Sequence, residues 1–420
     1  MAIREGARTA RLLAAPSAAL ALMSCSGHSA SGLGSKTVSP TSAAAIPTCA
    51  AAVYGKHCLS PAPIPTPTPA VPVVALSSVV FADPFHGWSV GSDCFQQCSI
   101  EVATTMNGGI SWQAPQIVGT VSTPPAGDFA AVAADIRFVG QNGWIFGPGI
   151  FQTHDGGRSW HRTVDATIDS IEPYADTVWA IQGCNAAPCT PRLLVSQPDS
   201  DTWQMAVPQP AFGVEAAGQP GMPGTVLERA PGGVAFVSTA SQDGQQALYV
   251  SRDIGRSWQS LSAPCTGIVS VRSVDGQQVW ALCSVPCCTQ NYVKGLYVSS
   301  DGGQHWRRQA ATDPTPAGSI PFRGSAEALA VTSPSVGLFG GFGEAGIWRS
   351  TDVGITWRPV FNDVCFGGGN AVAQLWFVNA LNGWAVSGTS VDASCPSLLH
   401  TVNGGVTWTA IPSPFGGAHN

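Results

Sequence analysis

The chain has 420 residues, of which only 10% are charged, and it contains 48 Gly, 33 Pro and 14 Trp. This composition is typical of many short strands joined by tight turns, and it disfavours a helical protein, which needs fewer Gly and Pro. The net charge of −6 and the count of three Lys argue against nucleic-acid binding and against an electrostatic membrane patch, since both need a basic surface.

The first 25 residues predict an export signal. Arg4, Arg8 and Arg11 give it a basic start, and the apolar run of residues 12–23 is too short to span a bilayer. The run ends in Leu-Met-Ser-Cys at residues 22–25, which resembles a bacterial lipobox, where lipid is attached to the Cys. We therefore expect lipidation at Cys25 and a location on the extracytoplasmic face of the cell membrane. The alternative is an ordinary cleaved signal and a secreted protein.

Residues 26–72 are rich in Ser, Ala, Thr and Pro, and Pro alternates with other residues over 61–69. Such a segment buries too little apolar surface to offset the entropy of ordering it. We therefore predict a disordered or polyproline tether between the signal and a folded part at residues 73–415. Cys49 and Cys58 lie inside this tether, at a spacing that can close a small loop.

A repeat follows the tether and is the dominant signal in the chain. Its template is Ser/Thr-x-Asp-x-Gly-x-x-Trp, and a seventh, degenerate copy at residues 196–203 has Pro198 and Ser200 in place of the Asp and Gly. The Trp residues recur every 43 to 55 residues, the length of one four-stranded blade with its loops. The sequence therefore predicts an all-β fold, a seven-bladed β-propeller of four-stranded antiparallel blades. The well-formed copies pair Asn107 with Trp112, Asp155 with Trp160, Asp253 with Trp258, Asp301 with Trp306, Asp352 with Trp357, and Asn403 with Trp408.

Each repeat has the same internal order, which the last copy shows. Residues 374–378, 384–386, 398–401 and 407–411 are its four predicted strands, with a turn through Asn382-Gly383 between the first two. The Asp-box then occupies the hairpin between strands three and four. Its Asp or Asn can accept backbone hydrogen bonds within its own turn, and its Trp is expected to pack between neighbouring sheets. Both residue types are predicted to be structural.

At these motifs the chain resembles the Asp-box (bacterial neuraminidase repeat, BNR) superfamily, which includes sialidases, xyloglucanases and sortilin. It is more similar to the photosystem II assembly-factor family, whose seven-bladed propellers repeat a Gly-Trp strand followed by Thr-x-Asp-Gly-Gly-x-x-Trp, as in Gly143-Trp144 with residues 153–160. The resemblance covers residues 76–414 and implies a propeller, a fold also built by WD40 and YVTN repeats. It implies an assembly role in which a basic patch holds a membrane-protein partner; here the evident basic pair is Arg307-Arg308.

An enzymatic function is the alternative to this assembly role. A sialidase needs three converging Arg, a Tyr nucleophile paired with Glu, and an acidic proton donor, but its Phe-Arg-Ile-Pro motif is missing, and Tyr249 and Tyr297 lie in apolar strands. Zinc-ligand spacing, a nucleophile elbow, a P-loop and a dinucleotide fingerprint are also missing. These observations favour a protein without catalytic residues, cofactor or metal. The alternative is a glycoside hydrolase, sialidase-like or using two carboxylates, that acts on extracellular polysaccharide.

Polar residues on the predicted innermost strands are candidates for lining the central channel. Two carboxylates among them are what a glycosidase needs, but a water-filled channel also needs a polar lining of balanced charge. The candidates are Arg137, Glu172, Glu228, Arg272, Glu327 and Gln374.

Ten Cys in the folded part are expected to form disulfides, because exported proteins meet an oxidising environment. The strand order places all ten, after strand two or after strand four, on the face opposite the Asp-boxes. Loops stapled over a rigid scaffold often carry binding residues, so we predict that this face binds the partner. The expected pairs are Cys365 with Cys395, Cys94 with Cys98, Cys184 with Cys189, and Cys265 with one of Cys283, Cys287 or Cys288.

The sequence thus predicts an exported, lipid-anchored propeller that acts as a non-catalytic binding or assembly scaffold for an unidentified protein or glycan. It is expected to be a monomer and to meet the membrane through its lipid anchor alone.

Overall fold

The computed structural model describes residues 74–94, 97–121, 134–184, 189–213, 225–240, 245–288, 291–312, 320, 324–341, 346–361, 372–387 and 396–415. The chain divides into two units, Met1–Pro67 and Thr68–Asn420, and every described residue belongs to the second. The expectations for Cys25, the tether, the Cys365–Cys395 pair and the side chain of Cys288 lie outside the described residues. In the described part of the chain, no helix is long and apolar enough to cross a membrane.

Seven four-stranded antiparallel sheets, each made of strands consecutive in the chain, form the blades. Blades 1 and 2 consist of β1 (Ala75–Phe81), β2 (Gly87–Asp93), β3 (Cys98–Thr105) and β4 (Gln116–Val121), then β5 (Asp135–Val139), β6 (Asn142–Phe146), β7 (Ile150–Thr153) and β8 (His161–Val164). Blades 3 and 4 consist of β9 (Ile168–Tyr174), β10 (Thr177–Gln182), β11 (Arg192–Ser196) and β12 (Gln204–Met205), then β13 (Val226–Ala230), β14 (Val234–Ala240), β15 (Gln246–Ser251) and β16 (Gln259–Leu261).

The remaining three blades have the same order. Blades 5 and 6 consist of β17 (Ile268–Ser273), β18 (Val279–Cys288), β19 (Asn291–Ser299) and β20 (Arg307–Ala311), then β21 (Ala326–Ser333), β22 (Val336–Gly341), β23 (Ile347–Ser350) and β24 (Arg358–Phe361). Blade 7 consists of β25 (Val372–Phe377), β26 (Gly383–Ser387), β27 (Leu398–Thr401) and β28 (Thr409–Ala410). A single 3₁₀ turn, η1 (Pro231–Gly233), separates β13 from β14.

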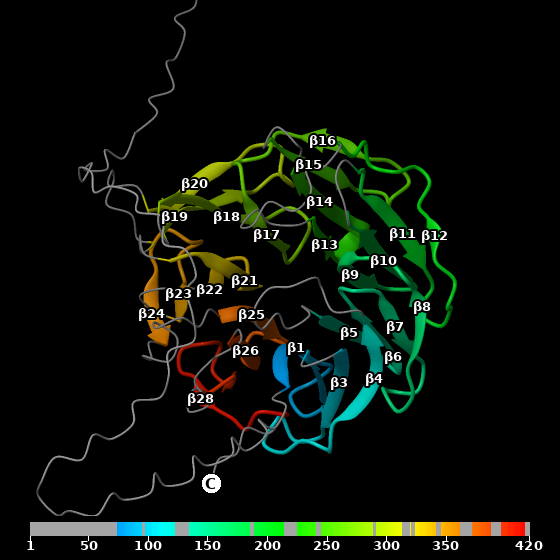
Figure 1. The fold of residues 1–420 in the computed structure, drawn as a ribbon. Helices are drawn as coiled ribbons and strands as arrows, with labels where there is room; N and C mark the ends of the chain where they lie inside the picture. Colours follow the sequence, from blue (N-terminus) through cyan, green and yellow to red (C-terminus); the bar gives the residue numbers. More distant parts are fainter. Residues whose placement is uncertain are drawn as a thin grey trace, which may run out of the picture. The chain divides into compact units, whose positions relative to one another are not determined.

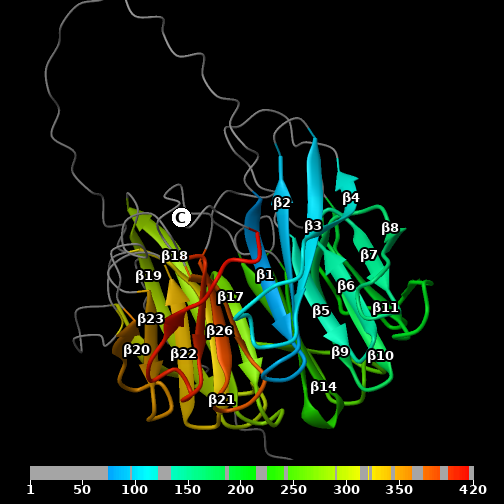
Figure 2. The same cartoon turned by 90° about the horizontal axis from the view of Figure 1, so that it is seen from below.

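The first strand of every blade is the innermost one, because β1, β5, β9, β13, β17, β21 and β25 contact one another in turn and β25 returns to β1. Figure 1 shows the blades around this ring, and Figure 2 shows them from the side. The predicted seven-bladed propeller is therefore confirmed. Two faces follow from the strand order. The Asp-box face carries the hairpins between third and fourth strands, and the channel-entry face carries the start of each innermost strand and the connections between second and third strands.

Each Asp-box holds its own turn together. In blade 2 the Asp155 carboxylate accepts hydrogen bonds from the backbone N–H groups of Arg158 and Ser159, both at 2.9 Å. In blade 4 the hydrogen bonds from Ser257 lower the pKa of Asp253, which keeps this carboxylate ionised. This is the local structural role that the repeat predicts.

The blades are joined by second-strand Trp residues that reach the Asp-box of the next blade. Trp88 Nε1 donates to the carbonyl oxygen of Gly156 at 2.9 Å, from blade 1 to blade 2. Trp88 also stacks on Phe138 of blade 2, with ring centroids 3.9 Å apart. The Asp-box Trp residues lie at the margin of these contacts: Trp357 and Trp408 are buried, and Trp112, Trp160, Trp203, Trp258 and Trp306 are half-buried.

The Gly that precedes the second-strand Trp has a different role from the one expected. The sequence suggests a turn through Asn-Gly, but Asn142 and Gly143 already belong to β6, and the turn itself is at residues 140–141. The ring of Phe138, opposite Gly143 in β5, lies where a Cβ on this Gly would be. The Gly is therefore required because an aromatic ring covers the backbone, and not because of turn geometry.

The ring closes through side-chain contacts between blade 7 and blade 1, which keep separate sheets. The ring of Trp384 in β26 stacks on that of Phe81 in β1, with centroids 3.6 Å apart and planes 5° apart. Trp384 Nε1 also donates to the Gly108 carbonyl oxygen at 3.1 Å, and Trp376 Nε1 donates to the Phe81 carbonyl oxygen at 3.1 Å. This seam repeats the inter-blade contact seen between blades 1 and 2.

Candidate functional site

Four charged residues on consecutive innermost strands form an arc in the ring: Arg137 on β5, Glu172 on β9, Glu228 on β13 and Arg272 on β17. Each lies opposite the large aromatic residue of the neighbouring second strand, so the four share one level of the propeller. The charges follow the order positive, negative, negative, positive. The arc is thus neutral overall.

One ion pair lies at each end of the arc. Arg137 Nη2 lies 3.3 Å from Glu172 Oε1, and Arg272 Nη1 lies 3.1 Å from Glu228 Oε2. The other oxygen of Glu228 accepts the backbone N–H of Ser273 at 3.0 Å. The carboxylates of Glu172 and Glu228 are therefore both held by donors of the protein itself.

Burial perturbs the acidic residue at the centre of the arc. The Glu228 side chain is 13% exposed, and this desolvation raises its pKa to about 7, although Arg272 opposes the shift. The neighbouring Glu172 adds to the rise, since two adjacent carboxylates repel when both are ionised. Glu228 consequently changes its charge near neutral pH.

This shift makes a prediction for stability. The folded chain holds a proton on Glu228 up to about pH 7, whereas the unfolded chain loses it near pH 4.5. The contribution of Glu228 is therefore fully present below pH 4.5 and is lost as pH rises through 7, by up to about 3 kcal/mol. Urea unfolding at pH 5 and pH 8 should show this loss in the wild type and a smaller loss in Glu228→Gln. The exposed Glu327→Gln is the control. Identical pH dependence in Glu228→Gln and wild type would contradict the shift.

A second polar level lies nearer the start of the innermost strands. Gln374 Nε2 donates to Ser78 Oγ at 2.9 Å, and Ser78 Oγ donates to Asp135 Oδ1 at 2.5 Å. Asp135 Oδ1 also accepts from Arg137 Nη1 at 2.8 Å, which links this level to the arc. The chain of bonds runs across blades 7, 1 and 2.

A pocket of about 410 Å³ opens beside this second level. It is lined by residues near the start of β1, β5, β9 and β25 and at the end of β6, so it belongs to the channel-entry face. Asp135 and Asp169 contribute carboxylates, Ser77, Ser78 and Gln374 contribute neutral polar groups, and the lining residues described include no Lys or Arg. The pocket thus favours a cationic or hydrogen-bond-donating group.

Two of the sequence candidates for channel lining are placed differently from the rest. Gln374 joins the second level, as just described. Glu327 lies at an irregularity between Ala326 and Ala328 in β21, where it is exposed and accepts a hydrogen bond from Ser325 Oγ at 2.8 Å. Among the described residues it takes no part in the ion pairs of the arc. The position of β21 that corresponds to Arg272 in β17 is Ala330, three residues further along the strand, so Glu327 lies off the level of the arc.

In the described part of the chain, three disulfides lie on the channel-entry face. Cys94–Cys98 and Cys184–Cys189 close the short connections expected from the sequence, and Cys283 is the partner of Cys265. Cys283 was expected after the second strand of blade 5 but lies within it, because β18 extends to residue 288. Exposed Cys287 lies near the end of the same strand.

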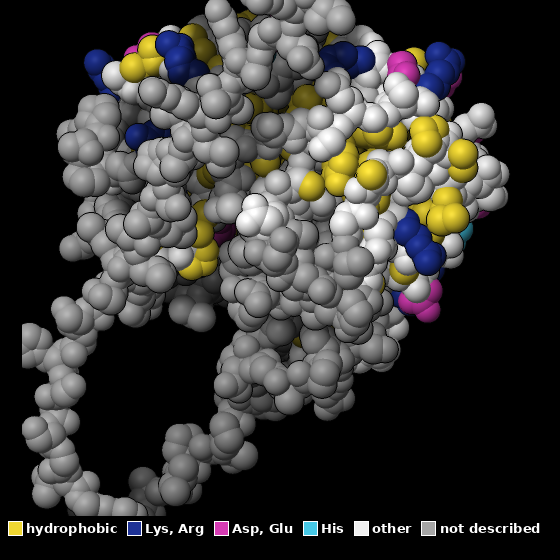
Figure 3. All heavy atoms as spheres, turned by 90° about the horizontal axis from the view of Figure 1, so that it is seen from above, with side chains coloured by type: hydrophobic (Ala, Val, Ile, Leu, Met, Phe, Trp, Pro, Cys, Tyr) yellow, Lys and Arg dark blue, Asp and Glu magenta, His cyan; other side chains and the backbone are white. Residues whose placement is uncertain are grey.

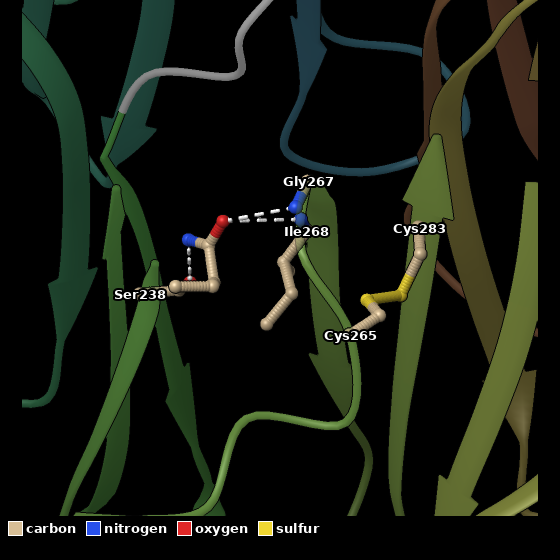
Figure 4. The surroundings of a disulfide bond; sticks show 6 residues. Ser238, Cys265, Gly267, Ile268 and Cys283 are labelled. Atoms are coloured by element: carbon tan, nitrogen blue, oxygen red, sulfur yellow. Dashed lines mark hydrogen bonds between the residues drawn. A yellow bond between two sulfur atoms is a disulfide. The ribbon is translucent and has the colours of Figure 1, made fainter. Parts of the chain in front are cut away.

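The Cys265–Cys283 bridge fixes the point where the chain enters blade 5. Figure 4 shows it beside Gly267 and Ile268, at the start of β17. The backbone N–H groups of both residues donate to Gln246 Oε1 in blade 4, at 3.2 and 3.4 Å. The entry segment is therefore tied to the blades on both sides.

Removal of this bridge has a predictable cost. The double variant Cys265→Ala/Cys283→Ala should lose about 3 kcal/mol of unfolding free energy, because the bridge spans 18 positions and restricts the unfolded chain. Cys94→Ala/Cys98→Ala, which opens a span of 4, should lose less, about 2 kcal/mol. Non-reducing urea unfolding measures both. Wild-type stability in the first variant would contradict the bridge.

Basic side chains do not form a patch on the side of the molecule shown in Figure 3. Among the side chains coloured there, those of Lys and Arg stand apart, separated by hydrophobic and uncharged groups. Arg307 and Arg308, the adjacent pair noted in the sequence, are both exposed at the start of β20.

The blade order and closed ring define the protein as a seven-bladed Asp-box propeller. No family model matches the sequence, and no curated protein matches it. Solved structures do share the fold. YCF48 bound to a D1 peptide has a TM-score of 0.51 at 18% identity, covering 79% of this chain and 94% of that one. YCF48 from Cyanidioschyzon merolae has a TM-score of 0.52 at 15% identity, covering 80% and 97%.

A propeller enzyme is similar to the same degree. A polysaccharide lyase, the PL25 ulvan lyase bound to its saccharide, has a TM-score of 0.51 at 10% identity, covering 81% of this chain and 98% of that one. The resemblance to the photosystem II assembly factor YCF48 is thus shown at the level of the fold. One fold here serves both peptide binding and sugar cleavage, so function has to be argued from the site.

Proposed function

We propose that this protein is an exported, lipid-anchored propeller that binds a segment of a protein partner at the pocket of its channel-entry face, without catalysis. The observation that carries the proposal is the pocket itself, about 410 Å³ in volume and bordered by Asp135 and Asp169. A lysine, an arginine or a chain amino group would be attracted by these carboxylates.

The bonding of the carboxylates supports binding rather than catalysis. A glycosidase needs one carboxyl group to give a proton to the sugar and a second to act on the opposite side. In this ring Glu228 and Glu172 are engaged by Arg272 and Arg137, and Asp135 by Ser78 and Arg137. Side chains held in this way present a fixed electrostatic surface.

The relatives supply further support. One of the similar structures is YCF48 in complex with a D1 peptide, so a propeller of this shape can hold a protein segment. The disulfides keep connections on the channel-entry face ordered before a partner arrives, which lowers the entropy lost on binding.

A photo-crosslinking amino acid at Ser77, inside the pocket, tests the proposal in living cells. We expect a discrete protein adduct from Ser77 and none from the control position Gln304, which is exposed on the Asp-box face. Asp169→Asn should weaken the Ser77 adduct, because it removes a charge from the pocket at constant volume. Adducts from Gln304 alone would mean that the partner binds the Asp-box face instead. Cleavage of a polysaccharide by the purified chain would contradict the proposal and show that the protein is an enzyme.

The anchor has its own prediction. Cys25→Ala should move the protein from the membrane fraction to the medium, because Cys25 ends the lipobox-like segment and is the attachment point proposed. Cell fractionation with immunoblotting measures this, with Cys49→Ala as the matched control. Unchanged membrane partitioning of Cys25→Ala would overturn the lipid anchor and leave the propeller's binding role to be judged by the crosslinks.

A further inference from the structure

Three metal-ligating side chains from two blades meet on the Asp-box face. His154 is the second residue of the blade 2 box, and His161 is the first residue of β8. Asp201 comes from the hairpin between β11 and β12 of blade 3, the next blade around the ring (Figure 1). The cluster lies on the face opposite the pocket described above.

The three side chains point their ligand atoms at one another. His154 Nε2 lies 2.9 Å from Asp201 Oδ1, and His161 Nε2 lies 2.8 Å from the same oxygen. All three ligand atoms lie within 4.8 Å of one another. The side chains are 32%, 48% and 53% exposed, so ions in solution can reach them.

The second nitrogen of His154 fixes the state of the first. His154 Nδ1 lies 2.7 Å from Asn142 Oδ1, which accepts hydrogen bonds, so Nδ1 carries the hydrogen. The other ring nitrogen, Nε2, faces Asp201 Oδ1, so the side chains of His154 and Asp201 can both bind one metal ion placed between them. An outer partner that orients a ligating His in this way is common in metal sites.

We propose that His154, His161 and Asp201 bind a divalent transition-metal ion, with Zn²⁺ the best match, and thereby clasp blade 2 to blade 3. Two imidazole nitrogens and one carboxylate suit Zn²⁺, whereas Ca²⁺ and Mg²⁺ prefer oxygen ligands. Zinc–ligand bonds of about 2.0–2.2 Å place ligand atoms about 3–3.5 Å apart, which these side chains reach by small rotations. Three protein ligands leave one position for water.

The repeat explains why the site is at this joint. In blade 4 the second residue of the box, Arg252, donates to the Gly302 carbonyl oxygen of blade 5 at 2.8 Å, so this position faces the next blade. Where the next box is degenerate, that contact is replaced by His154 and Asp201.

The sequence alone predicts no metal site. The three proposed ligands, His154, His161 and Asp201, are separated by 7 and 40 positions, which matches no known metal-binding motif. They come together because position two of one box and position six of the next face each other across the joint. None of the other boxes has a carboxylate at position six. The residues there are Ile110, Arg158, Arg256, Gln304, Ile355 and Val406.

Calorimetric titration of the full chain with ZnCl₂, without a polyhistidine tag and after EDTA treatment, tests the site. We expect one Zn²⁺ per chain that is lost, or weakened at least about 10–100-fold, in His154→Ala and in His161→Ala. His305→Ala is the matched control, because His305 contacts Asp301 and, among the described residues, belongs to no cluster of three metal-ligating side chains. Asn142→Ala should weaken binding less than either ligand variant.

Two further measurements separate a built site from surface binding. Co²⁺ should give a visible absorption band that disappears in His154→Ala, and Zn²⁺ should raise the melting temperature of the wild type but not of that variant. Equal Zn²⁺ affinity in wild type, His154→Ala and His161→Ala would overturn the proposal, as would equal losses in His305→Ala. Zn²⁺ binding that depends on both His residues without any change in melting temperature would refute the clasp.

Discussion

The Trp384→Ala variant is expected to be about 3–5 kcal/mol less stable than the wild type in urea unfolding, the usual cost of removing a large buried aromatic side chain. Trp384 is fully buried, stacks on Phe81 at 3.6 Å and donates to the Gly108 carbonyl oxygen. The Trp384→Ala variant therefore loses both apolar packing and a hydrogen bond between blades. Both contacts lie at the seam where the last blade meets the first.

Trp160→Ala is the matched comparison. Trp160 is half-buried, and its Nε1 donates to Gly157 within its own Asp-box at 3.0 Å. From the repeat alone a cost of about 3–5 kcal/mol is expected for this variant as well. The structure lowers that expectation, because less apolar surface is removed from contact with the core. Equal losses in the two variants would contradict a special role for second-strand Trp residues.

The features that could be predicted from the sequence are those that depend on local chemistry. Asp155 bonds to the backbone three and four residues further on, so the box carries its own structure wherever it occurs. Its recurrence then counts the blades, and its place in the hairpin fixes which face each connection occupies. The local pairs Cys94–Cys98 and Cys184–Cys189 follow from the same strand order.

The features that could not be predicted depend on exact register between strands. Glu327 lies three residues before Ala330, the position of β21 that corresponds to Arg272 in β17, and β18 continues to Cys288, so that Cys283 lies inside a strand. Contacts between blades could not be predicted from the sequence either, since Arg137 and Glu172 are 35 positions apart and His154 and Asp201 are 47 apart. Such pairs can be predicted only when the level of each residue within its blade is known.

Replacement of Arg137 by leucine is expected to cost about 3–5 kcal/mol at pH 8, because it breaks a buried pair from one side. Arg137 is 8% exposed and contacts Asp135 at 2.8 Å and Glu172 at 3.3 Å. Burial alone would lower its pKa, but these two carboxylates outweigh burial and raise it, so the guanidinium stays charged. Without it, two carboxylates remain in a poorly hydrated ring with no cation between them.

The charge argument separates this loss from a simple loss of packing. At pH 5 the uncompensated carboxylates of Arg137→Leu can take up protons, so the deficit against wild type should be smaller than at pH 8. The triple variant Arg137→Leu/Asp135→Asn/Glu172→Gln carries no unpaired charge at this position and should recover most of the stability at pH 8. Urea unfolding of the three proteins at both pH values decides the question. A deficit that is independent of pH and persists in the triple variant would mean that Arg137 acts through its packing against Phe146 and Trp376, whose ring centroids both lie 5.5 Å from its guanidinium. The channel would then be held by aromatic contacts, and the neutral arc would be a consequence of the fold and not one of its supports.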